Sequence, residues 1–150
     1  MLRKALVAGT AGSLAMDAIY AASAAALDRH HAPDDVDEET EAIVATVRRL
    51  APHVPVTLAK ERPRTTGRAV HYLFGCAFAL GYGRLRGAVP AFSKLGGAPY
   101  GAAVFLLSDL VLVPAAHIGR AWFRYGARER AIALGAHLAF AACLERVYSA

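Results

Sequence analysis

The sequence is poor in charge and in cysteine, and each shortage limits what the chain can be. Only 19% of its 150 residues are charged, against about a quarter in ordinary soluble domains, whereas 56% are hydrophobic. Such a composition excludes intrinsic disorder, which needs many charges and few apolar residues. Two cysteines cannot hold together a small disulfide-rich fold. What remains is an apolar chain whose length fits a single domain.

The few charges are also unevenly placed. Residues 28–68 hold 15 of the 29 charged residues. Four other stretches, 77 residues in total, contain only two charged residues, Asp17 and Asp109. These four stretches are 5–27, 69–83, 95–119 and 131–144. A helix on the surface of a soluble protein keeps one polar face, and these stretches have none. The pattern predicts an all-α integral membrane protein, a four-helix bundle that contacts the lipid bilayer.

We predict one membrane domain, 1–150, with an extramembrane loop at 28–64 and spans at about 5–27, 66–86, 95–119 and 128–148. The first and third spans exceed the roughly 20 residues that cross a bilayer. The second and fourth have only 15 and 14 residues between charges, a length that also suits a core helix of a soluble protein. Flanking arginines can extend both, because their head groups reach the interface.

The first span also resembles a secretory signal, since Arg3 and Lys4 precede an apolar stretch that ends in Ala22-Ser23-Ala24. Asp17 argues against that interpretation, because it falls within the apolar region.

The sequence of the first loop predicts a short amphipathic surface helix over 34–50, with acidic residues at its start and Arg48 and Arg49 at its end. Its apolar stripe would pack on the protein or rest on the membrane surface. The basic run Lys60 to Arg64 favours anionic lipid head groups. A net charge of +5 therefore needs no nucleic-acid partner, and no nucleic-acid-binding motif is present.

The distribution of lysines and arginines indicates how the chain is oriented in the membrane. Eleven lysines and arginines lie on the side of loops 28–64 and 120–127, and six lie on the side of the termini. This count favours cytoplasmic loops, although Arg3 and Lys4 ahead of the first span argue the reverse. Aromatic residues are expected at both interfaces: Tyr82, Tyr100 and Tyr148 on the side of the termini, and Tyr72, Trp122 and Tyr125 on the other.

Each predicted span carries a stripe of mostly small residues, spaced about four apart, that includes at least one ionisable residue. Such stripes let membrane helices approach closely. The stripes are Ala5, Gly9, Ser13, Asp17, Ala21 and Ala25; Gly67, His71, Gly75 and Ala79; Gly97, Gly101, Phe105 and Asp109; and Ala133, His137, Ala141 and Glu145.

Burying an ionisable group in a membrane is costly, so these residues need partners or a role. Judged by their depth in the bilayer, four of these residues could form one buried polar network: Asp17, His71, Asp109 and His137. His117 would lie near the loop-side surface. Interhelical hydrogen bonding, a proton or ion relay, and metal or haem ligation by His71 and His137 all remain open. We interpret Glu145 as an end residue that reaches the interface, and we expect no disulfide, because Cys76 and Cys143 differ in depth.

The run from His71 to Tyr82, HYLFGCAFALGY, resembles a signature of the YagU-like family of bacterial inner-membrane proteins. Supporting matches are the 101–119 segment with Pro114, and Gly135-Ala136-His137-Leu138 followed by Glu145 and Arg146. The resemblance covers about 66–148. It implies a similar helix count, a location in the bacterial inner membrane, and roles for His71 and His137. The biochemical function of the family is undetermined.

No Cys-x-x-Cys, His-Glu-x-x-His, Gly-x-Ser-x-Gly or phosphate-loop motif occurs in the sequence. We therefore expect a non-catalytic membrane component, a scaffold or an accessory subunit, with no cofactor. One alternative is a proton- or ion-linked channel or transporter that acts as a homo-oligomer, because four short helices enclose little volume. A second alternative is a membrane haem or redox protein.

Overall fold

A computed structural model describes residues 1–26, 44–45, 48, 56–116 and 126–150, and every element in this part of the chain is helical. The elements are α1 (Leu2–Ala26), α3 (Val56–Glu61), α4 (Pro63–Ala88), the 3-10 segment η1 (Pro90–Gly97), α5 (Ala98–Leu107), the π-helical segment η2 (Ser108–Leu112), α6 (Val113–Ala116) and α7 (Ala127–Ser149). The predicted all-α class is confirmed. Most of the predicted surface helix 34–50 lies outside the described residues.

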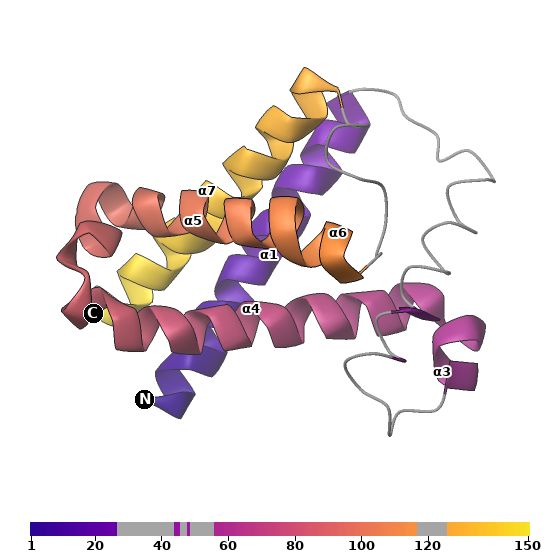
Figure 1. The fold of residues 1–150 in the computed structure, drawn as a ribbon, viewed down its shortest axis with the longest axis horizontal. Helices are drawn as coiled ribbons and strands as arrows, with labels where there is room; N and C mark the ends of the chain where they lie inside the picture. Colours follow the sequence, from indigo (N-terminus) through magenta and orange to yellow (C-terminus); the bar gives the residue numbers. More distant parts are fainter. Residues whose placement is uncertain (27–43, 46–47, 49–55, 117–125) are drawn as a thin grey trace.

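The long helices pack in pairs. Helix α1 packs along both α7 and α4, and α5 packs on α7. In Figure 1 the two termini and η1 lie toward the left of the view, whereas the end of α1 and the starts of α4 and α7 lie toward the right. Consecutive long segments therefore alternate in direction.

Three helical stretches in the described part are long and apolar enough to cross a membrane: Leu2–Ala26, Pro90–Leu112 and Ala127–Ser149. Only 33%, 22% and 28% of their most apolar windows are buried inside the protein. Helix α4 has 26 residues but does not reach the same apolarity, because any stretch of 18 residues within it includes Arg68 or Arg84. Three of the four predicted spans thus have the required length and composition.

The third segment begins three residues later than we predict. Leu95, Gly96 and Gly97 have φ values of 52°, 66° and 87°, so they form a left-handed turn instead of helix. Glycine adopts this conformation without a steric penalty. Pro99 then lies in the first turn of α5, where a missing N–H costs nothing.

Small residues bring the helix backbones together. A Cβ atom added to Gly9 would lie 2.5 Å from the Cα of Cys76 on α4, and one added to Gly101 would lie 2.6 Å from the carbonyl oxygen of His137 on α7. Neither position has room for a side chain. The contacts show that Gly9 and Gly101 of the small-residue stripes face neighbouring helices, whereas Ala21 and Ala25 at the end of the first stripe are exposed.

Candidate functional site

The four ionisable residues predicted to form one network fall into two groups. Asp17 and His71 lie between α1 and α4, and Asp109 and His137 lie between η2 and α7. No hydrogen bond or ion pair links the two groups among the described residues. His117 lies outside the described residues.

The first group surrounds a half-buried acid. The Tyr72 hydroxyl donates to Asp17 Oδ2 at 3.1 Å, and His71 Nε2 lies 3.8 Å from Asp17 Oδ1. Arg68 Nε lies 3.8 Å from Oδ2, but its side chain is 75% exposed. Asp17 therefore has three neighbours on α4, one of which is a hydrogen-bond donor at close range.

The second group is built on a buried imidazole. His137 is 7% exposed, and its Nδ1 lies 2.8 Å from the Ala133 carbonyl oxygen. Its Nε2 lies 3.2 Å from Ser108 Oγ, and Ser108 Oγ lies 2.9 Å from Asp109 Oδ1. The edge of the Phe105 ring contacts the imidazole, with the centroids 5.6 Å apart. Ser108 Oγ thus lies within hydrogen-bonding distance of the predicted acid and the predicted histidine, and it also donates to the Val104 carbonyl oxygen at 2.8 Å.

Pro114 explains how Ser108 comes to lie at this position. A proline has no N–H to donate to the carbonyl four residues earlier, and its ring crowds that carbonyl. The preceding turn is π-helical, with the N–H of Val113 donating to the Ser108 carbonyl oxygen. Single π-helical turns occur frequently at functional sites. The wider turn places Ser108 and Asp109 beside α7.

Sequence reasoning missed Ser108 and Tyr72 as members of these groups. The available signal for Ser108 was its position next to Asp109 in a segment that is otherwise almost entirely apolar. For Tyr72, the signal was its place beside His71, but we expected its hydroxyl at the membrane interface instead of on Asp17.

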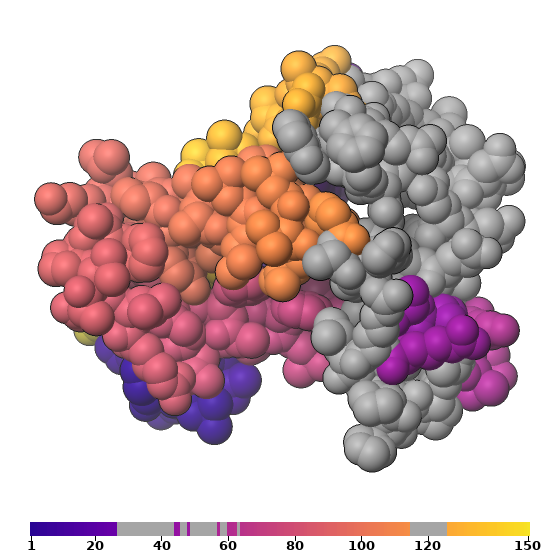
Figure 2. Space-filling view, viewed as in Figure 1, coloured from indigo at the N-terminus to yellow at the C-terminus, as the bar shows by residue number. Residues whose placement is uncertain are grey.

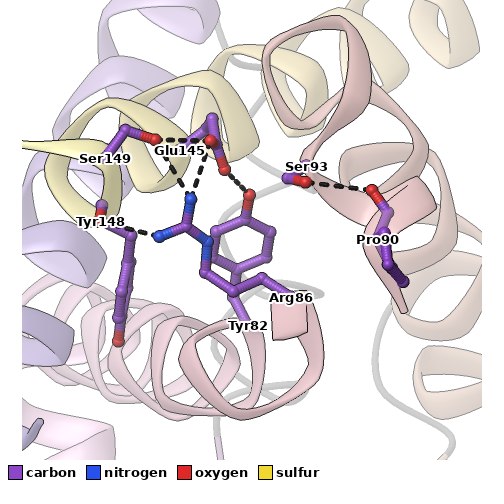
Figure 3. Close-up of polar contacts among 7 residues, drawn as sticks. All are labelled: Tyr82, Arg86, Pro90, Ser93, Glu145, Tyr148 and Ser149. Carbon is purple, nitrogen blue, oxygen red and sulfur yellow. Dashed lines mark hydrogen bonds and ion pairs between the residues drawn. The ribbon is translucent and has the colours of Figure 1, made fainter. Parts of the chain in front are cut away.

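A third polar cluster joins the ends of α4 and α7 (Figure 3). Arg86 Nη2 donates to Glu145 Oε1 at 3.0 Å, and Arg86 Nη1 donates to the Tyr148 carbonyl oxygen at 2.8 Å. The Tyr82 hydroxyl donates to Glu145 Oε2. Ser149 Oγ donates to Glu145 Oε1 at 2.5 Å. Glu145 thus has Arg86, Tyr82 and Ser149 as partners where α4 and α7 end, and our interpretation that it reaches the interface stays a prediction.

The two cysteines and a metal site are the remaining candidates. Cys76 and Cys143 are both free, as we expect from their different depths. Within the described ranges, no group of three or more histidine, cysteine, aspartate or glutamate residues could hold a metal ion.

Comparisons of the chain with models of known protein families, with curated proteins and with solved structures gave no match. The resemblance to the YagU-like family therefore stays a prediction.

Proposed function

We propose that this chain is a small integral membrane protein that crosses the bilayer four times and acts as a non-catalytic component, a scaffold or an accessory subunit. The observation that supports it best is the outward-facing apolar surface of the long helices. Large apolar side chains are exposed on α1, α4, α5 and η2, among them Leu6 at 50%, Leu14 at 55%, Leu73 at 70% and Val111 at 52%. In Figure 2 the α5 and η2 segments lie on the visible surface. Lipid would cover these side chains.

We propose that α4 also crosses the membrane, in addition to the three candidate spans. Its 26 residues span about 39 Å at 1.5 Å per residue, more than the hydrocarbon core requires. Its arginines lie near its two ends, where they can reach the interface, and Arg84 is exposed. The close contact of Gly9 with Cys76 holds α4 against α1, which is itself a candidate span.

A non-catalytic role fits the way the buried polar groups are used. Both ring nitrogens of His137 already face protein partners, and Glu145 is held by Arg86 and Tyr82. A haem iron would need a free imidazole nitrogen. His137 therefore offers no nitrogen for joint ligation of a haem with His71, and we propose that the protein works without a cofactor.

Location and partners extend the proposal. We place the protein in the bacterial inner membrane as a relative of the YagU-like family, with loops 28–64 and 120–127 in the cytoplasm. The excess of basic residues on that side supports this orientation. A homo-oligomer or another membrane protein would be its partner, and nucleic acid would not.

Reporter fusions after residues 30, 92, 122 and 150 test the number of crossings. Four crossings place the N-terminus, residue 92 and the C-terminus on one side of the membrane, and residues 30 and 122 on the other. Three crossings, with α4 outside the bilayer, place the two termini on opposite sides and would contradict the proposal. Purified protein in liposomes tests the role: proton or cation flux between pH 5 and 8 would contradict a non-catalytic component and favour the channel alternative.

A further inference from the structure

The ion pair between α1 and α4 lies at the surface of the chain. Arg68 Nε is 3.8 Å from Asp17 Oδ2, and the two side chains are 75% and 33% exposed. In the four-crossing arrangement both lie within membrane-spanning helices. Arg68 is five residues after the start of α4 at Pro63, about 8 Å along the helix. Charged side chains within spans almost always face the interior of a bundle, so an exposed pair needs a partner outside the chain.

The pair is also incomplete in its hydrogen bonds. A separation of 3.8 Å is too long for a hydrogen bond, so charge alone joins Arg68 and Asp17. The Tyr72 hydroxyl donates to Asp17 Oδ2. Within the part of the chain that the structure describes, Asp17 Oδ1 accepts no hydrogen bond and the Arg68 guanidinium donates none. A complementary partner therefore offers an acceptor to Arg68 and a donor to Asp17.

The surface around the pair suits close contact with another helix. We name it the outer face, and it consists of exposed residues of α1 and α4: Thr10, Leu14, Ala21, Ala69 and Leu73.

The α1 part of the outer face lies on the same side of the helix as Asp17. Its members are seven and three residues before Asp17 and four residues after it, a spacing that matches the helical repeat. Leu14 and Leu73 are 55% and 70% exposed. Between them, the small side chains of Ala21 and Ala69 leave room for a helix backbone to approach.

Charge complementarity favours a second copy of this chain over lipid. A lipid phosphate accepts from Arg68, but it has no donor for Asp17 and repels its charge. A second copy supplies both groups. Asp17 and Arg68 share one depth because they are in contact, and a two-fold axis along the membrane normal keeps every residue at its depth. Arg68 of each copy then faces Asp17 of the other, and the four charges alternate in sign.

We propose that the outer face of α1 and α4 is a homodimer interface in which Arg68 of each copy pairs with Asp17 of the other. The inference rests on the proposed four-crossing arrangement and names the partner that it leaves open. Leu14 and Leu73 pack against the second copy around the central charges. Within one chain the exposed ion pair adds little stability, so its main effect is on association.

Crosslinking of the full chain locates the interface. Cys76 and Cys143 are replaced by alanine, and one cysteine is introduced at a time. Leu73→Cys lies on the outer face, and Leu106→Cys is the matched control on α5, where the side chain is 51% exposed. Membranes that contain either variant are treated with a short bismaleimide. We expect covalent dimers from Leu73→Cys and monomers from Leu106→Cys.

Charge reversal tests whether the two charges make the contact. Differently labelled copies are reconstituted in liposomes, and their association is measured by energy transfer at increasing lipid dilution. We expect Asp17→Arg and Arg68→Asp each to weaken self-association about tenfold, because two symmetric contacts become repulsive. Mixed with each other, the two variants should associate as the wild-type chain does, because each offers the charge that the other lacks. A contact confined to one chain gives no such recovery.

Arg84→Asp is the control for net charge. It makes the same change in charge at an exposed arginine near the other end of α4, and association should not change.

Three results would overturn the proposal. The first is a wild-type chain that stays monomeric at every lipid dilution. The second is crosslinking through Leu106→Cys and not through Leu73→Cys, which needs no charge-reversal variant to fold. The third is a mixture of folded Asp17→Arg and Arg68→Asp chains that associates no better than either alone. A monomer that reporter fusions show to cross four times would refute the dimer and leave the proposed function intact.

Discussion

Replacing Gly9 with alanine tests the close contact between α1 and α4. The added Cβ would lie 2.5 Å from the Cα and 2.7 Å from the N of Cys76, and 2.9 Å from the carbonyl carbon of Gly75. All three are backbone atoms, so no side chain can rotate away and the helices must separate. Overpacking of this kind costs about 1–3 kcal/mol. Alanine is also the better helix former, which offsets about 0.5–1 kcal/mol of that cost.

Gly135→Ala is the matched control, since a Cβ at that position on α7 meets nothing within 4 Å. The gain in helix propensity is common to both variants, so the difference between them isolates the cost of overpacking, about 1–3 kcal/mol. Unfolding by SDS in mixed micelles can be followed by near-ultraviolet circular dichroism of the packed tyrosines Tyr82, Tyr100 and Tyr148. Equal free energies of unfolding for Gly9→Ala and Gly135→Ala would refute the reasoning.

The same assay checks three further predictions. Arg86→Gln and Glu145→Gln should show a coupling of about 1–3 kcal/mol in a double-mutant cycle, because a charged hydrogen bond joins them; zero coupling would contradict this. Tyr82→Phe should cost about 0.5–1.5 kcal/mol, since the lost hydroxyl donates to Glu145, and unchanged stability would argue against that bond. Arg68→Ala should cost less than about 1 kcal/mol, because the side chain is 75% exposed; a larger loss would show that Asp17 depends on it.

Charge depletion and small-residue spacing predicted approximately where the long helices lie and part of the faces that they bury, although Ala21 and Ala25 of the first stripe are exposed. Gly9 and Gly101, singled out by their spacing, are both in contact with a neighbouring backbone. These features are local, because helix periodicity depends only on residues a few positions apart. The same patterns found Asp17, His71, Asp109 and His137 as the ionisable residues on those faces.

The pairing of these residues could not be predicted, because it depends on how each helix is rotated. The π-helical turn before Pro114 shifts the face that η2 presents, so that Asp109 reaches His137 through Ser108 and not directly. Arg86 and Glu145 were separately expected at the ends of spans. Their contact depends on α4 and α7 ending side by side, which residues 59 positions apart do not reveal.

Extraction of cell membranes with alkaline carbonate tests the central claim most directly. The apolar windows of α1, α7 and the Pro90–Leu112 stretch are mostly unburied within the protein, and we propose that lipid covers them. We predict that the full chain stays in the membrane pellet and that only detergent releases it. Recovery of the chain in the carbonate supernatant, as a monodisperse protein free of detergent, would contradict the account.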